Sequence, residues 1–546
     1  MRLIAVLFFL SSFNLVSRAA ETPLYQRWEE SFTASKETPS TTELRVEFMS
    51  PDGKTTKVPG YWDGGKTWRV GFMPVATGTW KYATKSTPAV EGLHDQRGSF
   101  MVTKPKETSA FDRHGPLRIG DSKMHLAHRD GTPFFFLADT CWTGPALSNR
   151  INWADYVSDR KRKGFTSIQY NALSPWRAAP TDAEGRLPYV LEPEFAINPE
   201  YFNRLDTKID AINDAGLLAT HVLVWANKKG DAGIELKPEQ LERLLKYQVA
   251  RYGAHNVFWI LVGDNRYAPE TAEQWKKLGR AVFADPSFDS RTHVVTTHPT
   301  GMNWPWKGWE NEAWLNVLSY QSGHGDGDKT WQWITSGPPA EYGKQKNPTR
   351  PVINLEPPYE EHVAYQSKKP HDELNVRRAM IWSLLNAPTA GVTYGGHGVW
   401  SWHTKPGEPP TDHPGSGNAL VWREALDLPA ATKLAGIREI FEDLRWSELR
   451  PAAGLLTTQP GEKDAAAWVS VAATPDNRTV VIYAPKGKYD VNLPANFKQR
   501  WNQKTIKLQA KDSQSSETSF PASGPHPLNE DHGQEVLVIL KSGNGK

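Results

Sequence analysis

Hydrophobic and polar residues alternate in the N-terminal part of the chain. Leu44, Val46 and Phe48 are separated by single polar residues, and this run ends at the turn sequence Pro51-Asp52-Gly53. Alternation with a period of two places every second side chain on one face of a β-strand, and turn residues between such runs are typical of hairpins. We therefore predict a small antiparallel β-sandwich in an N-terminal domain that covers residues 20–105.

The pattern then changes to short apolar runs that alternate with amphipathic helices. One helical stripe contains Phe202, Leu205 and Ile209 and ends at Gly216. Eight apolar runs lie at 134–138, 166–170, 217–225, 257–262, 293–297, 314–318, 352–355 and 390–394. Strands and helices that alternate over about 300 residues are typical of a (β/α)8 TIM barrel, which we predict for residues 106–445. A doubly wound sheet is the competing arrangement, but no run is followed by a phosphate-binding loop such as GxGxxG.

Hairpin patterning returns in the C-terminal part of the chain. Apolar runs at 467–471, 480–483, 489–493 and 536–540 are separated by Pro, Gly, Asp and Asn. We predict a second β-sandwich over residues 446–546. The segment 510–531 is rich in Ser, Pro and polar residues, and we expect it to form a long loop. The predicted fold is therefore multidomain, with a central TIM barrel flanked by two β-sandwiches.

Composition and charge narrow the class of protein. The 546 residues are 38% hydrophobic and 23% charged and include 23 Trp, which argues against a disordered or fibrous chain. The formal charge of +3 falls to +1 when the first 19 residues are left out, because these hold Arg2 and Arg18 and leave 62 basic against 61 acidic residues. A nearly neutral chain is not typical of nucleic-acid-binding proteins, so we expect no nucleic-acid partner.

The N-terminus predicts export. Arg2 is followed by an apolar run at 3–10 and then by Ser17-Arg18-Ala19, which is the charged, apolar and small-residue order of a secretory signal peptide. We expect cleavage near Ala19 and a periplasmic or secreted protein. The apolar run is too short to cross a bilayer, and no later stretch approaches 18 unbroken apolar residues, so no membrane span is predicted.

The only cysteine, Cys141, excludes an internal disulfide and cysteine-rich zinc sites. Neither an HExxH sequence nor an EF-hand pattern is present. We therefore predict neither a metal nor a cofactor.

Two carboxylates stand out among the polar residues that follow the apolar runs. In a barrel, catalytic residues lie where the strands end, and Asp264 follows the fourth run while Glu356 follows the seventh. A retaining glycosidase needs an acid/base and a nucleophile on opposite sides of one bond, about 5 to 5.5 Å apart. From its position alone, Asp264 could equally be a helix N-cap. Pro357-Pro358 prevents immediate helix entry after Glu356, which leaves that carboxylate available.

The surrounding strand ends are typical of a carbohydrate pocket. Sugar rings present C–H faces to flat aromatic rings and hydroxyl groups to amides and histidines. The predicted substrate-binding residues are Asp139, Trp142, Asn171, Trp225, His298, Tyr320, Tyr359, Tyr394, His397 and Trp400. Asp139 could instead orient a neighbour or cap the first helix, and each histidine could be a hydrogen-bonded wall of the pocket rather than a ligand.

Several motifs in the barrel region resemble those of the apiosidase-like glycoside hydrolases. They are Phe136-Leu137-Ala138-Asp139-Thr140, the Asn-hydrophobic-Trp-hydrophobic-Gly-Asp strand at 256–264, Asn354-Leu355-Glu356-Pro357, and Tyr-Gly-Gly-His-Gly-Val-Trp at 394–400. The segment 28–104 resembles the small β-domain that commonly precedes these barrels. The C-terminal sandwich is similar to a type named for collagen binding, and we do not read that name as evidence for a ligand.

The resemblance covers nearly the whole mature chain and implies a reaction. The family includes enzymes that remove the branched pentose apiose from pectic side chains, and it implies Asp264 as acid/base and Glu356 as nucleophile of a retaining mechanism. Two positions depart from the family pattern: Val262 and Ala138 stand where glycine is common. We expect both to lie close to the substrate, so they bear on which sugar is bound.

The sequence thus predicts an exported glycoside hydrolase that acts on a plant or algal polysaccharide or oligosaccharide. In this mechanism Asp264 must hold a proton while Glu356 stays ionised. We expect burial to favour the protonated form of Asp264, and hydrogen bonds from Asn, Tyr or Arg to favour the ionised form of Glu356. Two alternatives remain: a non-catalytic glycan-binding or surface protein, which would not need both carboxylates, and an endo-acting β-glycanase, which would need an open groove. The oligomeric state is not predicted.

Overall fold

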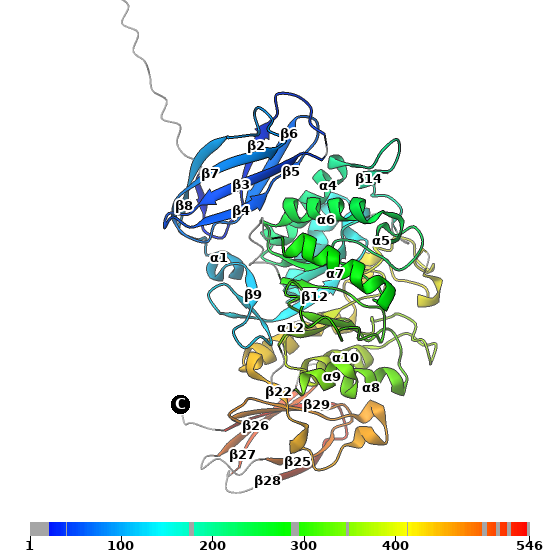
Figure 1. The fold of residues 1–546 in the computed structure, drawn as a ribbon. Coiled ribbons are helices and arrows are strands. Elements are labelled where there is room, and N and C mark those ends of the chain that lie inside the picture. The colour runs from blue at the N-terminus through cyan, green and yellow to red at the C-terminus, as the bar shows by residue number, and fades with distance from the viewer. Residues whose placement is uncertain are drawn as a thin grey trace, which may run out of the picture.

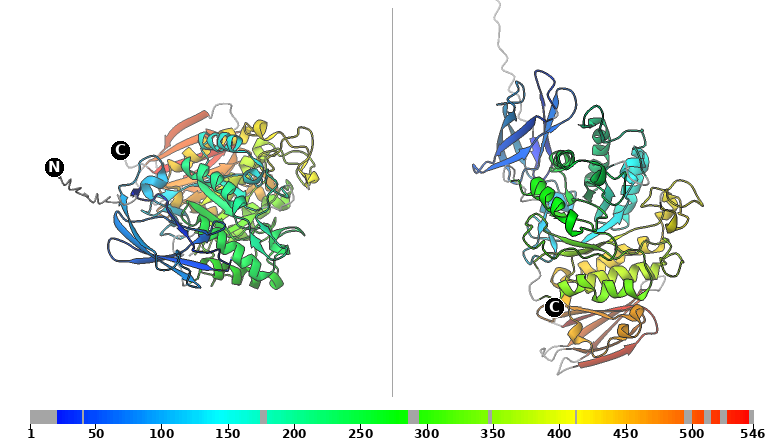
Figure 2. Two further views of the ribbon diagram at one scale, coloured as in Figure 1. Left: turned by 90° about the horizontal axis from the view of Figure 1, so that it is seen from above. Right: turned by 45° about the vertical axis from the view of Figure 1, so that its right-hand side comes forward.

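The computed structural model describes residues 21–39, 41–173, 179–285, 294–345, 349–411, 413–493, 500–508, 514–520 and 526–542. Three units lie in a row, with a β-rich unit at each end of a central barrel (Figure 1; Figure 2, right). The predicted TIM barrel between two β-sandwiches is confirmed. The predicted signal peptide and its cleavage site lie outside the described residues. Within the described residues, no helix combines the length and the apolar character needed to cross a membrane.

The N-terminal unit packs two sheets against each other. One has the order β1 (Glu21–Pro23), β8 (Arg97–Thr103), β7 (Gly78–Thr87), β3 (Glu43–Met49) and β4 (Thr55–Pro59), and the other has the order β2 (Trp28–Thr33), β6 (Thr67–Phe72) and β5 (Tyr61–Trp62). Leu44, Val46 and Phe48 are buried while their neighbours in β3 are exposed, as the alternation predicts. Aromatic rings fill the core, and those of Phe48 and Phe72 stack with their centroids 4.0 Å apart.

The central sheet contains eight parallel strands. They are β12 (Phe136–Thr140), β13 (Ser167–Asn171), β16 (Leu218–Val222), β17 (Val257–Ile260), β18 (Val294–Thr296), β19 (Leu318–Gln321), β20 (Val352–Glu356) and β21 (Gly391–Tyr394). Their order is β18-β17-β16-β13-β12-β21-β20-β19. The first and last strands of this order meet where the Val317 amide donates to the carbonyl of Val295 over 3.1 Å and the Thr296 hydroxyl donates to the carbonyl of Val317 over 2.9 Å. These contacts close the barrel.

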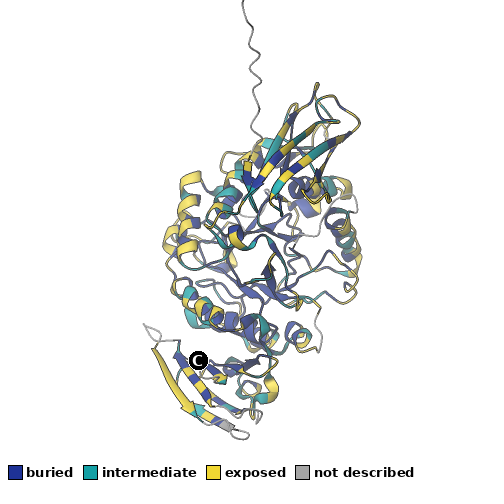
Figure 3. Cartoon of the chain, turned by 90° about the vertical axis from the view of Figure 1, so that its left-hand side faces the viewer, coloured by how far each residue is buried: buried dark blue, intermediate teal, exposed yellow. Residues whose placement is uncertain are grey.

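Helices cover the outside of the barrel (Figure 3). They are α2 (Gly144–Leu147), α3 (Arg150–Arg162), α4 (Pro199–Asp214), α5 (Ala232–Glu235), α6 (Pro238–Tyr252), α7 (Pro269–Phe283), α8 (Asp328–Ser336), α9 (Pro338–Gly343), α10 (Glu373–Leu385), α11 (Trp422–Ala425) and α12 (Pro429–Glu442). The predicted stripe in α4 is buried, and the helix begins where the Asn198 side chain accepts from the amide of Glu200. At its end Gly216 has φ +70°, a left-handed conformation that glycine adopts without strain.

Smaller elements connect these parts. The helix α1 (Ala110–His114) and a three-stranded sheet of β9 (Leu117–Ile119), β10 (Leu126–His128) and β11 (Pro133–Phe134) precede the barrel. A hairpin of β14 (Tyr189–Val190) and β15 (Ala196–Ile197) lies between β13 and α4.

Strand alternation decides which side chains enter the barrel. In β12, Phe136 and Ala138 belong to the interior cluster, whereas Leu137 packs outward with α10 and α12. The rings of Phe136 and Phe258 meet in the interior with centroids 5.4 Å apart, although their strands are not neighbours. Successive side chains of a strand point to opposite faces, so Asp139 must face the helices, like Leu137.

The C-terminal unit is also built from two sheets. One has the order β22 (Arg450–Pro451), β23 (Ser470–Ala473), β24 (Thr479–Ala484), β29 (Val536–Ser542), β26 (Trp501–Lys507) and β27 (Gln514–Phe520), and the other pairs β25 (Lys488–Leu493) with β28 (His526–Asp531). The expectation of a loop over 510–531 is therefore wrong. The strand β27 pairs with β26 along its whole length, but its residues are exposed on both faces, so no alternation of hydrophobic residues marks it.

Short 3₁₀ turns at Trp446–Glu448, Ala453–Leu455, Pro460–Glu462 and Ala465–Ala467 lead into this unit, and another, Pro414–Ser416, lies in the last barrel loop. One core joins the C-terminal unit to the barrel, because Trp382 of α10 and Leu537 of β29 belong to the same buried cluster. The buried carboxylate of Glu535 receives two hydrogen bonds of 3.1 Å from the Nε of Arg377 in α10 and one of 2.7 Å from the hydroxyl of Tyr483.

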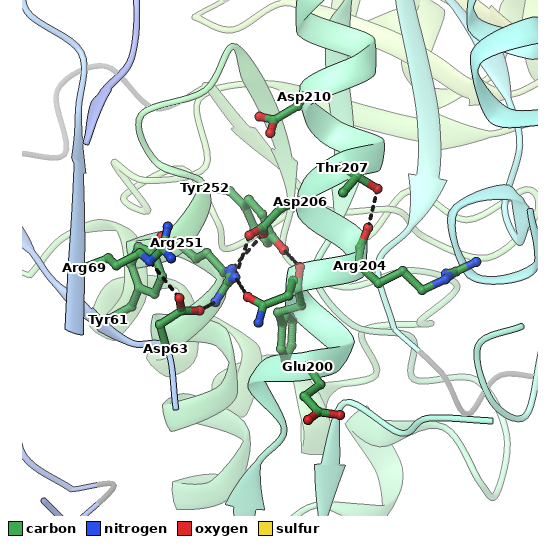
Figure 4. Close-up of polar contacts among 12 residues, drawn as sticks. Tyr61, Asp63, Arg69, Glu200, Arg204, Asp206, Thr207, Asp210, Arg251 and Tyr252 are labelled. Atoms are coloured by element: carbon green, nitrogen blue, oxygen red, sulfur yellow. Dashed lines mark hydrogen bonds and ion pairs between the residues drawn. The ribbon is translucent and has the colours of Figure 1, made fainter. Parts of the chain in front are cut away.

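The N-terminal sandwich is held to the barrel by a buried arginine (Figure 4). Arg251 of α6 has a side chain that is 2% exposed and donates to Asp63 of the sandwich over 2.9 Å and to Asp206 of α4 over 2.7 Å. Its guanidinium lies 4.9 Å from the ring centre of Tyr61. Because Asp63 also pairs with Arg69 at 2.7 Å, the contact is a charge network rather than a single ion pair.

A cavity of about 1010 Å³ lies beside this contact, between the sandwich and the helices α6 and α7. Its barrel wall includes His255, Asn256 and Val257, which lead into the amino end of β17. The cavity is therefore at the opposite end of the barrel from the strand ends that carry the predicted catalytic residues.

Candidate active site

The carboxyl ends of the barrel strands bring together an aromatic wall. The rings of Trp142 and Trp225 meet edge to face with centroids 5.1 Å apart, and the ring of His298 lies 5.5 Å from the first and 5.9 Å from the second. All three side chains are buried. They follow β12, β16 and β18, so three of the predicted substrate-binding residues form one surface.

A β-bulge turns Glu356 toward this surface. In the pairing of β19 with β20, Tyr320 lies opposite Asn354, but the next residue, Gln321, lies opposite Glu356, so Leu355 is an extra residue. Asn354 faces the helices, where its amide donates to the hydroxyl of Ser383 in α10 over 3.0 Å. Without the extra residue, simple alternation would give Glu356 the same outward direction. The bulge therefore places the predicted nucleophile inside the barrel mouth.

Two histidines approach the Glu356 carboxylate. The Nε2 of His324 lies 2.9 Å from Oε1, and the Nε2 of His298 lies 3.4 Å from Oε2. Burial alone would raise the pKa of Glu356, but the contacts with His298 and His324 outweigh it and hold the pKa well below the usual range of a glutamate. Glu356 is therefore an ionised carboxylate, although the residue is only 6% exposed.

The backbone fixes the tautomer of His324. Its Nδ1 accepts a hydrogen bond of 3.4 Å from the amide of Tyr359, so in the neutral ring the proton is on Nε2 and points at Glu356. The ring also stacks on His362, with centroids 4.0 Å apart. Burial holds the pKa of His362 well below its usual value, with His324 contributing in the same direction. Stacking and hydrogen bonding together aim one N–H of His324 at the carboxylate.

Asp264 follows β17 in an unusual backbone conformation. Its φ of +52° lies in the left-handed region, which is uncommon for residues other than glycine and is concentrated at functional sites. The residue before it must be glycine, because a Cβ on Gly263 would lie 2.2 Å from the ring of Trp225. The amide of Asn227 donates to Oδ2 of Asp264 over 2.9 Å. Asp264 is partly exposed as a residue, although its Oδ1 is buried.

Tyr359 connects the two carboxylates electrostatically. Burial raises the pKa of its hydroxyl well above the usual value, and the negative charges of Glu356 and, more weakly, Asp264 act in the same direction. Both carboxylates therefore lie within electrostatic range of one phenol. Tyr359 belongs to the same interior cluster as Trp142 and Trp225.

The last barrel loop contributes Trp400 and His397. The indole N–H of Trp400 donates to Nδ1 of His397 over 3.0 Å, and Nε2 of His397 lies 3.0 Å from the carbonyl of Gly417. An imidazole that accepts at one nitrogen and donates at the other is neutral. Burial lowers the pKa of His397 to about 4, which agrees with this assignment. His397 thus orients Trp400, and the carbonyl of Trp400 accepts from the amide of Thr143, next to Trp142.

Asn171 reaches the strand end, but its side chain serves its own loop. Its amide donates to the carbonyl of Leu173 over 2.9 Å and its oxygen accepts from the amide of Leu173 over 3.3 Å.

Three predicted substrate-binding residues face the helices instead of the pocket. Asp139 accepts from the hydroxyl of Tyr156 over 2.7 Å and lies 3.3 Å from Arg160, both on α3. Burial raises the pKa of Asp139 to about 6, although Arg160 and Tyr156 act in the opposite direction. The structure therefore directs Asp139 toward the side chains of α3 and away from the two candidate carboxylates.

Tyr320 and Tyr394 have the same outward direction. Burial raises the pKa of Tyr320, and the groups that act against this are Ser383 of α10 and Asn354. The hydroxyl of Tyr394 donates to Glu360 over 2.7 Å, and Glu360 also accepts from the amide of Ala430 at the start of α12. Both tyrosines lie between the sheet and its helices, because strand alternation gives them this direction.

Sequence reasoning did not select His324, although it ends the sixth strand segment, Tyr320-Gln321-Ser322-Gly323-His324. It lies three residues beyond the end of β19, so strand alternation gives no signal for its direction. The donors to Glu356 are thus histidines and not the expected Asn, Tyr or Arg. In the described part of the chain, no group of three or more His, Cys, Asp or Glu side chains is arranged to hold a metal ion.

Comparison with known families agrees with this geometry. A model of the apiosidase-like catalytic domain matches residues 121–448, which is more than half of the chain. A domain of unknown function, DUF5060, matches residues 21–87 in the N-terminal sandwich. No curated protein sequence matches the chain.

Solved structures share the fold. A glycoside hydrolase with 23% identity covers 81% of this chain and 100% of its own, with a TM-score of 0.67. A family 5 glycoside hydrolase from Bacteroides vulgatus ATCC 8482 with 19% identity covers 80% of this chain and 95% of its own, with a TM-score of 0.66. A proposed glycoside hydrolase from the same organism with 18% identity covers 96% of this chain and 100% of its own, with a TM-score of 0.72.

The family match extends over the whole barrel, from before β12 to beyond α12. It sets aside the alternative of a non-catalytic protein on a barrel scaffold. The chain belongs to the apiosidase-like family, and the protein is a glycoside hydrolase.

Proposed function

We propose that the protein is an exported glycoside hydrolase that removes sugar side chains from a plant or algal polysaccharide by a retaining mechanism. The observation that carries this proposal is the state of Glu356, which two histidines keep ionised at the mouth of the barrel. A buried carboxylate that neighbouring groups hold in its ionised form is suited to attack an electron-poor carbon.

The first step is a displacement at the anomeric carbon. Glu356 attacks this carbon, a bond forms between it and a carboxylate oxygen, and the bond to the leaving oxygen breaks. Asp264 transfers its proton to that oxygen, so the rest of the polysaccharide leaves as a neutral alcohol. In the second step Asp264 takes a proton from water, the water oxygen replaces Glu356 on the anomeric carbon, and both side chains return to their starting states.

The environments of the two carboxylates support this division of roles. Asp264 is partly exposed and accepts from the amide of Asn227, and this exposure lets a carboxyl group exchange protons with solvent and with a leaving group. This differs from the expectation that burial would hold its proton. Glu356 is buried against His298 and His324 and has no such access. The strained backbone of Asp264 is further support, since the fold maintains it despite a cost of about 1–3 kcal/mol.

The pocket favours a neutral sugar. Trp142, Trp225 and Trp400 offer flat apolar faces, and the charge of the ionised Glu356 disfavours an acidic sugar. The side-chain pentose of pectins, for which the family is named, is therefore the first candidate. Of the two departures from the family pattern, Val262 packs in the outward core and Ala138 lies in the barrel interior.

A substrate screen tests the proposal. Wild type, Glu356→Gln and Asp264→Asn are incubated with pectic, hemicellulosic and algal polysaccharides, and released sugars are identified by chromatography. We expect wild type to release a monosaccharide and Glu356→Gln to release none. Larger fragments would instead support an endo-acting β-glycanase. If Glu356→Gln releases as much sugar as wild type, Glu356 is not the nucleophile.

Stereochemistry and leaving-group dependence test the mechanism. Proton NMR during hydrolysis should show the initial product with the anomeric configuration of the substrate, and the opposite configuration would contradict a retaining mechanism. Relative to wild type, Asp264→Asn should lose less activity on a dinitrophenyl glycoside than on an alkyl glycoside, because dinitrophenolate leaves without protonation. Equal losses on both would contradict the role of Asp264.

Export is a separate part of the proposal and rests on the N-terminal sequence pattern. Expression of the full chain in a bacterial host with N-terminal sequencing of the periplasmic and medium fractions tests it. We expect a mature protein that begins near Ala20, and a protein found only in the cytoplasm with an intact N-terminus would contradict export.

A further inference from the structure

Gln321 is a buried amide at the mouth of the barrel that the mechanism above does not use. It is the last residue of β19 and is 7% exposed. Its side-chain oxygen has no hydrogen-bond partner among the described residues. Buried amide oxygens in proteins almost always have a donor, and leaving one without a donor costs about 1–3 kcal/mol. The missing donor must come from solvent or from a bound molecule.

The position of Gln321 points to the substrate as that molecule. The bulge that turns Glu356 into the barrel mouth also brings it level with Gln321, on the neighbouring strand. Ser319, two residues earlier, reaches across to the carbonyl of Thr297 inside the barrel, so strand alternation directs Gln321 inward as well. The two side chains therefore leave adjacent strands in the same direction.

The backbone around Gln321 is fixed, and a glycine lies beside its amide oxygen. Its carbonyl accepts a hydrogen bond of 2.8 Å from the amide of Met302, in the loop between β18 and β19. Gly301, next in that loop, is exposed, and a Cβ there would lie 3.8 Å from the amide oxygen of Gln321. Because glycine has no side chain, residue 301 leaves space beside this buried oxygen.

We infer that Gln321 is a substrate-positioning residue whose amide oxygen accepts a hydrogen bond from a hydroxyl group of the sugar bound at Glu356. This inference rests on the proposed function. A site built to bond a hydroxyl group discriminates strongly against an analogue that lacks it, because the buried acceptor is then left without a donor. Gln321 therefore contributes specificity for a free hydroxyl over a deoxy, methylated or acetylated position.

A double-mutant cycle between protein and substrate tests the inference. Gln321→Met keeps the length of the side chain and removes the acceptor, and Gln332→Met on the exposed face of α8 is the matched control. The kcat/KM of wild type and both variants is measured on the aryl glycoside that wild type cleaves best and on its monodeoxy analogues. We expect Gln321→Met to lose about tenfold to a hundredfold on the parent glycoside, in line with one unsatisfied buried group.

The decisive readout is the loss of discrimination at one hydroxyl. For one deoxy analogue, wild type should lose a similar factor relative to the parent, whereas Gln321→Met should cleave that analogue and the parent with nearly equal kcat/KM. If Gln321→Met discriminates at every hydroxyl as wild type does, the inference is wrong. Gln321→Ala is the second variant, used in the same cycle if the methionine variant does not fold.

Failure of the inference can be distinguished from failure of the proposed function. If wild type cleaves no glycoside, the proposed function fails, and binding of a monosaccharide panel is then measured by ligand-observed NMR on wild type and Gln321→Met. Weaker binding of at least one sugar to Gln321→Met would still support the role of Gln321. Equal binding, or no binding to wild type, would overturn it.

Discussion

His324 should control the charge of Glu356, and its replacement by alanine tests this directly. His324 supplies the shorter of the two contacts to the carboxylate, 2.9 Å against 3.4 Å for His298. Alanine removes this donor while the burial that disfavours the charged form remains. The pKa of Glu356 must therefore rise.

The size of the rise follows from the hydrogen bond that is lost. A hydrogen bond to a charged group stabilises it by about 1.5–3 kcal/mol, and about 1.4 kcal/mol corresponds to one pH unit, so the pKa of Glu356 should rise by about one to two pH units. In wild type the pKa of Glu356 lies so far below its usual range that Glu356 does not set the acid limb of kcat/KM. In His324→Ala a larger fraction of Glu356 is protonated, and the protonated form cannot act as the proposed nucleophile.

The assay is the dependence of kcat/KM on pH, measured from about pH 3 to about pH 8 on the substrate found in the screen. We expect kcat/KM of His324→Ala to fall faster than that of wild type toward the acid end of this range, because the pKa of Glu356 is about one to two pH units higher in the variant. His324→Gln offers an amide N–H in a similar place and should give an intermediate limb. His94→Gln, in the N-terminal sandwich, is the control and should leave the profile unchanged.

An equal loss of activity at all pH values, with an unmoved acid limb, would refute this reasoning. His324 would then act through packing against His362 rather than through the charge of Glu356.

Three further predictions concern stability. Arg251→Leu removes the cation that Asp63 and Asp206 share. It should lower the free energy of unfolding in urea by about 3 kcal/mol, while kcat/KM of the folded protein stays unchanged. Asp139→Asn weakens the pairing of the fully buried Arg160 and should cost about 1–3 kcal/mol without changing KM; a raised KM would contradict its outward direction. Burial lowers the pKa of His221 to about 4, so the unfolded chain takes up a proton between about pH 6.5 and pH 4 that the folded chain does not. Between pH 7 and pH 5 this difference in proton uptake should lower the free energy of unfolding by about 2 kcal/mol. His221→Gln should show a smaller decrease over the same pH range.

The arrangement of the chain could be predicted because burial leaves a direct record in the sequence. The alternation in β3 and the helical stripe in α4 are both consequences of one face being buried, and both appear in the structure as predicted. The strand β27 has no alternation of hydrophobic and polar residues. It is an edge strand that backbone hydrogen bonds hold to β26, and all of its residues except Phe520 are exposed. Patterns of side chains predict strands only where side chains, rather than backbone pairing, determine the strand.

Two candidate carboxylates could be selected from the sequence, but the direction of the neighbouring side chains could not. A residue at a strand end was taken as a candidate for the pocket, yet alternation sends Asp139 and Tyr394 to the helices. Applying the period of two to each strand would have removed them. The same rule applied to β20 would have removed Glu356 as well, because only the extra residue Leu355 reverses its direction. Bulges depend on the pairing of two strands, which a single sequence does not display.

The electrostatics of Glu356 depend on chain segments that are distant in the sequence. His298 comes from the end of β18, and His324 follows β19 and is aimed by the backbone amide of Tyr359, beyond β20. No local motif contains this set, because each contact exists only when three loops meet at the closed barrel. The closure between β18 and β19 therefore matters for chemistry as well as for the fold, since it sets the spacing of the two loops that carry the histidines. A change that loosened this closure, far from any catalytic side chain, should raise the pKa of Glu356 in the same direction as the loss of His324 itself.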